Sequence, residues 1–258
     1  MFDSPESRRR LLLGAGALLL TSCAPASGQL STNAPAQPGA PGPSAPGTGV
    51  MAENDEDEDE GGITYAVSPS EDLMREHGVL NRVLLIYEES VRRLDGSDEL
   101  PSDALVSTID LTRRFVEDYH ARLEEEHLFP RFLQAHKHAD LVTILAKQHK
   151  VGRQITDQLQ SLTGSGAVDK PAGRAKTSAL IRAYVRMSRP HEAREDTVLF
   201  PAMREIMTAD TFSKLYDIFE EREQDELGGD GFSGIVSELT DLERQFGIHE
   251  LDLFTARV

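Results

Sequence analysis

The sequence predicts an all-α protein whose folded part is an antiparallel, up-down four-helix bundle with one or two extra C-terminal helices. From residue 68 onward, apolar residues recur at helical spacing over four long stretches. Short polar connections separate these stretches, which favours antiparallel neighbours. No pair of alternating apolar runs flanks a tight turn, so nothing indicates a β-hairpin.

The first helix is expected to start after Ser68 and to end near Leu94. Ser68-Pro69-Ser70-Glu71 has the pattern of a capping box with proline at the first helical position. Asp95-Gly96-Ser97 then interrupts the pattern. The apolar face of this helix carries Leu73, His77, Leu80, Leu84, Tyr87 and Val91.

Three further long helices follow, at about 102–129, 139–162 and 172–207. Pro130 is expected to kink or end the second helix, because proline lacks a backbone N–H. The three faces contain, in order, Leu105, Ile109, Val116, His120, Leu123, Glu124 and His127; Leu141, Leu145, His149, Gly152, Ile155 and Leu159; and Leu180, Tyr184, Met187, His191, Glu195 and Val198. Two shorter helices, at about 210–226 and 234–246, are expected to cover an end of the bundle.

The first residues indicate export and a lipid anchor. Three arginines precede an apolar run at 11–20, which is too short to span a bilayer and is typical of a signal peptide, predicted at 1–22. Leu20-Thr21-Ser22-Cys23 resembles a bacterial lipobox, whose cysteine is lipidated, and the arginine-leucine segment resembles a twin-arginine signal. We therefore expect a lipoprotein of the bacterial cell envelope, on the periplasmic face, with the outer membrane as an alternative site.

Residues 23–62 are expected to form a disordered tether, rich in proline, glycine and alanine and then acidic at 53–60. The bundle is assigned to 63–207 and a C-terminal helical extension to 208–258. Cys23 is the only cysteine, so no intrachain disulfide or CxxC motif is present. The formal net charge of −17 does not favour nucleic acid as a partner.

The pattern H-x-x-x-E-x-x-x-L-F-P occurs twice, at 120–130 and 191–201. In a helix, residues four apart lie on one face, so each copy points an imidazole and a carboxylate the same way. Two such faces turned towards each other offer two nitrogen and two oxygen ligands inside one bundle. This arrangement is typical of a metal site.

Two more histidines, His77 and His149, lie on the apolar faces of the other two helices. One buried histidine usually finds hydrogen-bond partners, but four of them, one per helix and two with a glutamate four residues on, favour a metal site. The candidate ligands are His77, His120, Glu124, His149, His191 and Glu195. Without thiolates, structural zinc is disfavoured, whereas six nitrogen and oxygen ligands suit two metals with carboxylate bridges. With Glu124, Glu195 and an oxo or hydroxo group as bridges, each octahedral metal keeps one open position.

These six residues and both L-F-P triplets resemble the hemerythrin-like, HHE cation-binding proteins over about residues 70–205. The resemblance implies a four-helix bundle around a non-haem di-iron centre, with two iron ions held by the six residues. In the family that this chain resembles, the oxygen carriers have an H-x3-H motif on the third helix. This chain instead has Arg153 four residues after His149. They also use five histidines and an H-x4-D aspartate. The ligand set here is more similar to hemerythrin-like domains of iron sensors and of iron-centre repair proteins.

The leading hypothesis is therefore an exported, lipid-anchored di-iron protein that binds or reacts with dioxygen, peroxide or nitric oxide. Iron storage, donation or iron-centre repair is one alternative. A metal that only stabilises a partner-binding bundle is another. No nucleophilic triad, phosphate loop or nucleotide fingerprint is present, so an enzymatic role would be that of a di-iron oxidoreductase.

Several residues near this set have roles that the pattern leaves open. His127 is a further ligand, a supporting group beside the ligands or a partly solvated helix-end residue. Arg153 contacts a bridging glutamate, attracts an anion into the site or reaches solvent. Tyr87 and Tyr184 are core aromatics or hydrogen-bond donors to bound oxygen. Glu125 is expected at the surface or in a supporting role, and His136 and His138 are expected to be solvated. His249 has no partner that the sequence indicates. Gly152 is expected to leave space for a small ligand.

Overall fold

The computed structural model describes residues 67–258, and these are helical with no β-strand among them. The all-α prediction is confirmed for this part of the chain. The expected signal segment at 1–22, the lipidated Cys23 and the tether to residue 62 lie outside the described residues. Within 67–258, no helix is both long and apolar enough to cross a membrane.

The helices follow the predicted order closely. Helix α1, Pro69–Asp95, begins at the expected capping box: the Ser68 backbone N–H donates to Glu71 over 2.9 Å, and Ser68 Oγ accepts from the Glu71 N–H. The later helices are α2 Ser102–Leu111, α3 Ala121–Leu123, α4 Phe129–Gln134, α5 Ala139–Gly164, α6 Pro171–Arg194, α7 Phe200–Ile206, α8 Ala209–Leu227 and α9 Gly231–Phe246. Short 3-10 turns occupy Ala167–Asp169 and Leu251–Phe254.

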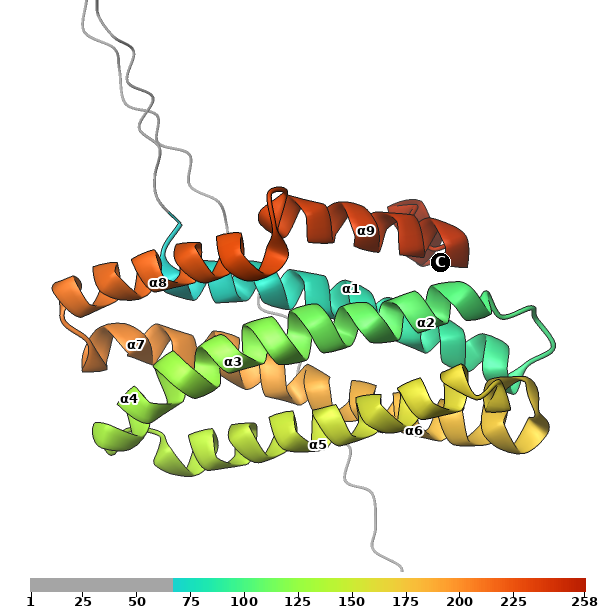
Figure 1. Cartoon of the computed structure of the whole chain (residues 1–258), viewed down its shortest axis with the longest axis horizontal. Helices are drawn as coiled ribbons and strands as arrows, with labels where there is room; N and C mark the ends of the chain where they lie inside the picture. Colours follow the sequence, from blue (N-terminus) through green and yellow to red (C-terminus); the bar gives the residue numbers. More distant parts are fainter. Residues whose placement is uncertain (1–66) are drawn as a thin grey trace, which may run out of the picture. The chain divides into compact units, whose positions relative to one another are not determined.

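Helix α1, the α2–α3 stretch, α5 and α6 lie side by side with their long axes along the molecule (Figure 1). Helix α6 packs against both α1 and α5, and α2 packs against α5. The expected apolar face of α1 is buried, with Leu73, Leu84 and Tyr87 fully inaccessible. The core thus forms between these four helical stretches, as their periodicity predicts.

Three π-helical segments interrupt the regular helices: Thr112–His120, Glu124–Leu128 and Glu195–Leu199. They change the expected effect of Pro130, because the helical path does not stop there but continues to Gln134. At the end of the second segment the Phe129 N–H donates to the Glu124 carbonyl, five residues back. The wider turn places Pro130 at the start of a new α-helical segment, where no N–H is needed. Pro201 follows Glu195–Leu199 in the same way.

Helices α8 and α9 lie along α1 rather than across an end of the helices, and α9 also contacts α2 (Figure 1). Arg82 of α1 donates to both carboxylate oxygens of Glu243, at 2.8 and 2.6 Å, and to Thr240 at 2.9 Å. Leu239 and Phe246 are buried in this contact region. The C-terminal helices therefore cover one side of the molecule, which the sequence pattern does not reveal.

Candidate metal centre

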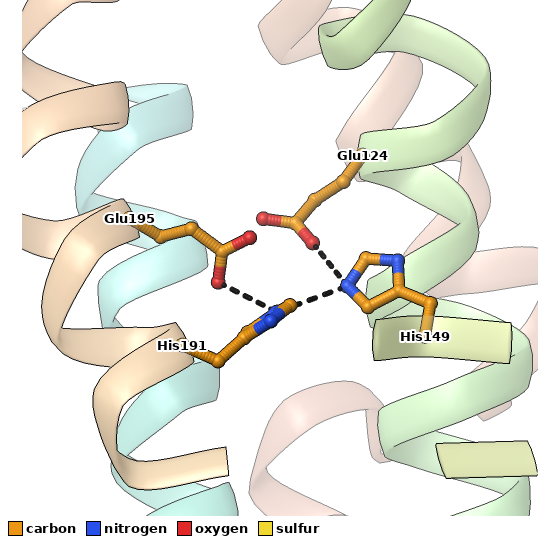
Figure 2. A group of neighbouring side chains, drawn as sticks. All are labelled: Glu124, His149, His191 and Glu195. Carbon is orange, nitrogen blue, oxygen red and sulfur yellow. Dashed lines mark hydrogen bonds and ion pairs between the residues drawn. The ribbon is translucent and has the colours of Figure 1, made fainter. Parts of the chain in front are cut away.

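The structure brings the six candidate ligands together from four helical stretches. Glu124, His149, His191 and Glu195 form one group, in which one nitrogen or oxygen atom per residue lies within 4.8 Å of the others. Figure 2 shows these four side chains turned towards one another. His77, His120 and Glu124 form a second group by the same measure, so Glu124 belongs to both.

All four histidines turn Nε2 inwards. His149 Nε2 lies 3.1 Å from His191 Nε2 and 3.3 Å from Glu124 Oε2. His191 Nε2 lies 3.1 Å from Glu195 Oε2. On the other side, His77 Nε2 is 3.5 Å from Glu195 Oε2, and His120 Nε2 is 3.8 Å from Glu124 Oε2. Each glutamate therefore lies near one histidine of each pair.

The outward nitrogen of every histidine, Nδ1, has a polar partner. The four contacts are His77 with Asp196 at 2.7 Å, His120 with Glu76 at 2.6 Å, His149 with Glu125 at 3.0 Å and His191 with Gln148 at 2.9 Å. An imidazole that donates from Nδ1 keeps its lone pair on Nε2, which is the form that binds a metal. The inward nitrogens are thus prepared as ligands.

The two motif copies orient histidines that belong to other helices. In the first copy, Glu125 contacts His149 and Phe129 stacks on the same ring, with ring centroids 5.4 Å apart. In the second copy, Asp196 contacts His77 and Phe200 stacks on it at 5.3 Å. The phenylalanine of each motif, and the acidic residue that follows the motif glutamate, therefore orient a histidine of another helix.

The two motif histidines, His120 and His191, also have partners on other helices. Each partner is the residue directly before a histidine that lies outside the motifs, His77 or His149. Glu76 precedes His77 and contacts His120, and Gln148 precedes His149 and contacts His191. Glu76, Gln148 and Asp196 are functional residues that the sequence pattern alone did not predict. The signal was a polar residue directly before each lone histidine and an acidic residue directly after each motif glutamate.

Buried polar atoms at the centre fit a cation. Both carboxylate oxygens of Glu124 and of Glu195, and Nε2 of His77, are buried without a hydrogen-bond partner. Leaving a buried polar atom unpaired costs about 1–3 kcal/mol, and more for a charged group. A bound cation would satisfy all five atoms, so the donor set fits a metal-binding site.

The four histidines differ in their affinity for a proton. Burial lowers the pKa of His120 to about 4 and that of His191 to about 3, so both imidazoles are neutral near pH 7. Burial opposes protonation of His77 and His149 as well, but their carboxylate neighbours outweigh it and raise each pKa to about 9. A cation must displace a proton from each of these two residues, which makes metal uptake weaker at low pH.

The residues with open roles take different positions. Arg153 donates to both oxygens of Glu125, at 2.8 and 3.1 Å, and so contacts a supporting residue rather than Glu124 or Glu195. The side chain of His127 is 23% exposed and belongs to neither ligand group. The Tyr87 hydroxyl hydrogen-bonds to Thr112 over 2.8 Å in the core. His249 Nε2 lies 2.9 Å from a carboxylate oxygen of Glu250.

A cavity of about 40 Å³ adjoins the four histidines. A buried water needs roughly 10–15 Å³ of such space, so the cavity has room for a molecule of a few heavy atoms. The remaining wall includes Leu80, Val116, Glu117, Gly152, Tyr184 and Met187. Gly152 therefore lies where the sequence predicted space for a small ligand.

The fold and the site define a metal-binding helical protein. The family model described as the hemerythrin HHE cation binding domain matches residues 68–203 and again 140–245. The chain belongs to this hemerythrin HHE family.

Similar proteins occur in mycobacteria. The uncharacterized protein Rv1995 of Mycobacterium tuberculosis is 46% identical over 190 residues, which cover 73% of this chain and 74% of the relative. The uncharacterized protein Mb2018 of Mycobacterium bovis is similar to the same extent. No solved structure matches the chain.

Proposed function

We propose that this protein is a non-haem di-iron protein that binds or reacts with a small oxidant such as dioxygen, peroxide or nitric oxide. The observation that carries the proposal is the centre itself: four inward imidazole nitrogens and two carboxylates with unpartnered oxygens, beside a cavity of small-molecule size. Iron accepts this mixture of nitrogen and oxygen ligands.

In this proposal His77 and His120 would hold one iron, and His149 and His191 would hold the other. Glu124 and Glu195 bridge the two ions, and the distances from each glutamate to one histidine of each pair support this assignment. The frame is an antiparallel up-down four-helix bundle. The irons would supply open coordination positions and electrons for a small ligand. The protein supplies oriented imidazoles and a small, largely apolar cavity that limits access of water.

The test is anaerobic loading of the purified chain with ferrous ions, followed by metal analysis and by absorption spectroscopy after exposure to dioxygen. Two irons per chain and a ferric spectrum are expected. His149→Ala should lower the iron content, whereas the matched control His249→Ala, which changes a histidine of the C-terminal segment, should not. Retention of zinc alone, or of no metal, contradicts the proposal.

We further propose export and lipid anchoring at Cys23. The arginines at 8–10, the apolar run at 11–20 and the lipobox-like 20–23 support this. The protein would then act at the bacterial cell envelope, on the periplasmic side of a membrane. Cys23→Ala should move the expressed protein from the membrane fraction to the soluble fraction, and an unchanged distribution counts against the anchor.

A second candidate function is iron storage, donation or repair of iron centres. It is favoured by Arg153, which pairs with Glu125 at the position where the oxygen carriers have a further histidine. Rapid transfer of iron from the loaded chain to an apo acceptor would support this function, and an inert centre would contradict it. If the metal instead only stabilises a partner-binding bundle, His149→Ala should unfold the domain, and the loaded chain should show no redox chemistry.

A further inference from the structure

Glu117 is an acidic side chain in the wall of the cavity beside the four histidines. It lies three residues before His120 in the π-helical segment Thr112–His120 and is 4% exposed. Gly152 of α5 faces it, because a Cβ placed on Gly152 would lie 3.5 Å from Glu117 Oε1. Because Gly152 has no side chain, nothing at this position separates the Glu117 carboxyl group from the cavity.

The contacts of Glu117 are incomplete for a buried carboxylate. Oε1 accepts a hydrogen bond from Thr156 over 2.6 Å. Arg113 Nη1 lies 2.8 Å from Oε2, but Oε2 has no hydrogen-bond partner, so this contact is an ion pair without hydrogen-bond alignment. Arg113 is also shared with Asp157. Oε2 is therefore buried beside the Arg113 guanidinium without a well-aligned hydrogen bond, and Oε1, on the Gly152 side, has one donor.

Glu117 is more often protonated at a given pH than an exposed glutamate is. Burial raises its pKa to about 7, although Thr156, Arg113 and Arg153 act in the opposite direction. Asp118 on its own segment raises the pKa further. The other titratable groups that face this region are the four histidines of the same cavity, Asp157 of α5, Tyr184 of α6 and Tyr87 of α1.

The equivalent positions in the opposite wall of the cavity carry no acid. Ser188 lies three residues before His191, as Glu117 lies three before His120, and Leu80 lies three after His77, as Gly152 lies three after His149. Ser188 and Leu80 line the same cavity. One wall thus combines a glycine with an acid, while the equivalent wall combines a leucine with a hydroxyl.

We propose that the Glu117 carboxyl group contacts a small anionic ligand in this cavity, donating a hydrogen bond to it while protonated and repelling it once ionised. The inference rests on the proposed function, because the ligand is taken to bind beside the metal centre. The ligand class is an anion of two or three heavy atoms, which the cavity volume admits. A neutral wall at this position would lack the switch between attraction and repulsion.

The experiment measures azide affinity of the iron-loaded full chain by difference absorption across neutral pH. Affinity of the unaltered protein should fall by up to about tenfold per pH unit once Glu117 ionises. Glu117→Gln keeps a hydrogen-bond donor and cannot ionise, so its affinity should stay near the low-pH value throughout. The matched control Ser188→Ala changes the equivalent wall and should keep the pH dependence. An unchanged pH dependence in Glu117→Gln overturns the inference.

A second variant and a second readout keep the test decisive if Glu117→Gln does not fold. Thr156→Val removes the hydrogen bond that favours the ionised form, so the midpoint of the affinity change should move to higher pH. Infrared spectroscopy should show a protonated carboxyl band that titrates near neutral pH and shifts when azide binds. If the chain binds no iron, the proposed function fails. If it binds iron and azide but neither Thr156→Val nor the infrared band behaves as stated, only the present inference fails.

Discussion

The two halves of the centre share one layout but differ in charge. In the His77–His120 half, both outward nitrogens face acidic side chains, Asp196 and Glu76, and burial raises the pKa of Glu76 to about 8. In the His149–His191 half, the partners are Glu125, which Arg153 neutralises, and the amide of Gln148. The repeated motif thus sets the positions of the ligands, whereas the supporting residues set how strongly each half attracts a cation.

The two halves also differ in their cover. Asp72, five residues before His77, is 7% exposed on α1, beside the C-terminal helices. Ile144, five residues before His149, is 54% exposed on α5. The α1 side of the centre is therefore covered by additional helices, whereas this part of α5 faces solvent.

The largest expected effect on metal retention comes from removing Glu124, the residue that both halves share. Glu124 belongs to both candidate ligand groups, so, for the two ions proposed above, Glu124→Ala should abolish metal retention. His77→Ala and His149→Ala should each leave about one metal per chain, in the opposite half. Native mass spectrometry of the loaded variants measures this, with Glu126→Ala, 44% exposed in its side chain, as the control. Equal losses in all three site variants would show that the halves do not bind separately.

The next effect should come from exchanging the supports. Glu76→Gln gives His120 the same kind of partner that His191 has, and we expect metal affinity in that half to fall by roughly 10–100-fold. Gln148→Glu should raise the affinity of the other half. Competition with a chelator of known affinity measures both changes. If both variants leave the affinities unaltered, the charge of the support is not what distinguishes the halves.

The sequence predicts local features of this centre well and remote ones poorly. The four long helices follow from apolar spacing, and the pairs His120–Glu124 and His191–Glu195 follow from the four-residue spacing within one helix. The support of His77 by Asp196 joins residues 119 positions apart, so no local pattern contains it. The π-helical segments escaped prediction because each adds only one residue to a turn. The course of α8 and α9 along α1 depends on tertiary contacts such as that of Arg82 with Glu243.

A smaller effect is expected at the stacked rings. Phe129 and Phe200 occupy equivalent positions and are 3% and 1% exposed. Phe129→Leu and Phe200→Leu should each lower the free energy of unfolding by about 1–2 kcal/mol, through lost packing on His149 and His77. Chemical denaturation of the metal-free variants measures the two values. A difference larger than the measurement error would show that the equivalence of the two halves does not extend to packing.

The smallest effect concerns the shielded acid. Burial and the neighbouring Glu76 raise the pKa of Asp72 to about 7, above its unfolded value. The folded state therefore holds this proton more tightly, and the stability of the protein falls as the pH rises from about 4 to about 7. Asp72→Asn should stabilise the protein by on the order of 1 kcal/mol at pH 8 and hardly at all at pH 4. Thermal unfolding at both pH values measures this, with Asp140→Asn at the exposed start of α5 as the matched control.

The two parts of the chain orient each other's histidines: Glu125 contacts His149, and Asp196 contacts His77. This bears on which fragments of the chain could form the centre. A fragment ending after α4 would contain His77, His120 and Glu124, but its Glu125 and Phe129 would lack their target His149. Its own His77 would in turn lack the acid and the ring that orient it. Two copies of such a fragment could complete each other by the same contacts. Neither part of the chain therefore contains all the contacts that orient its own histidines.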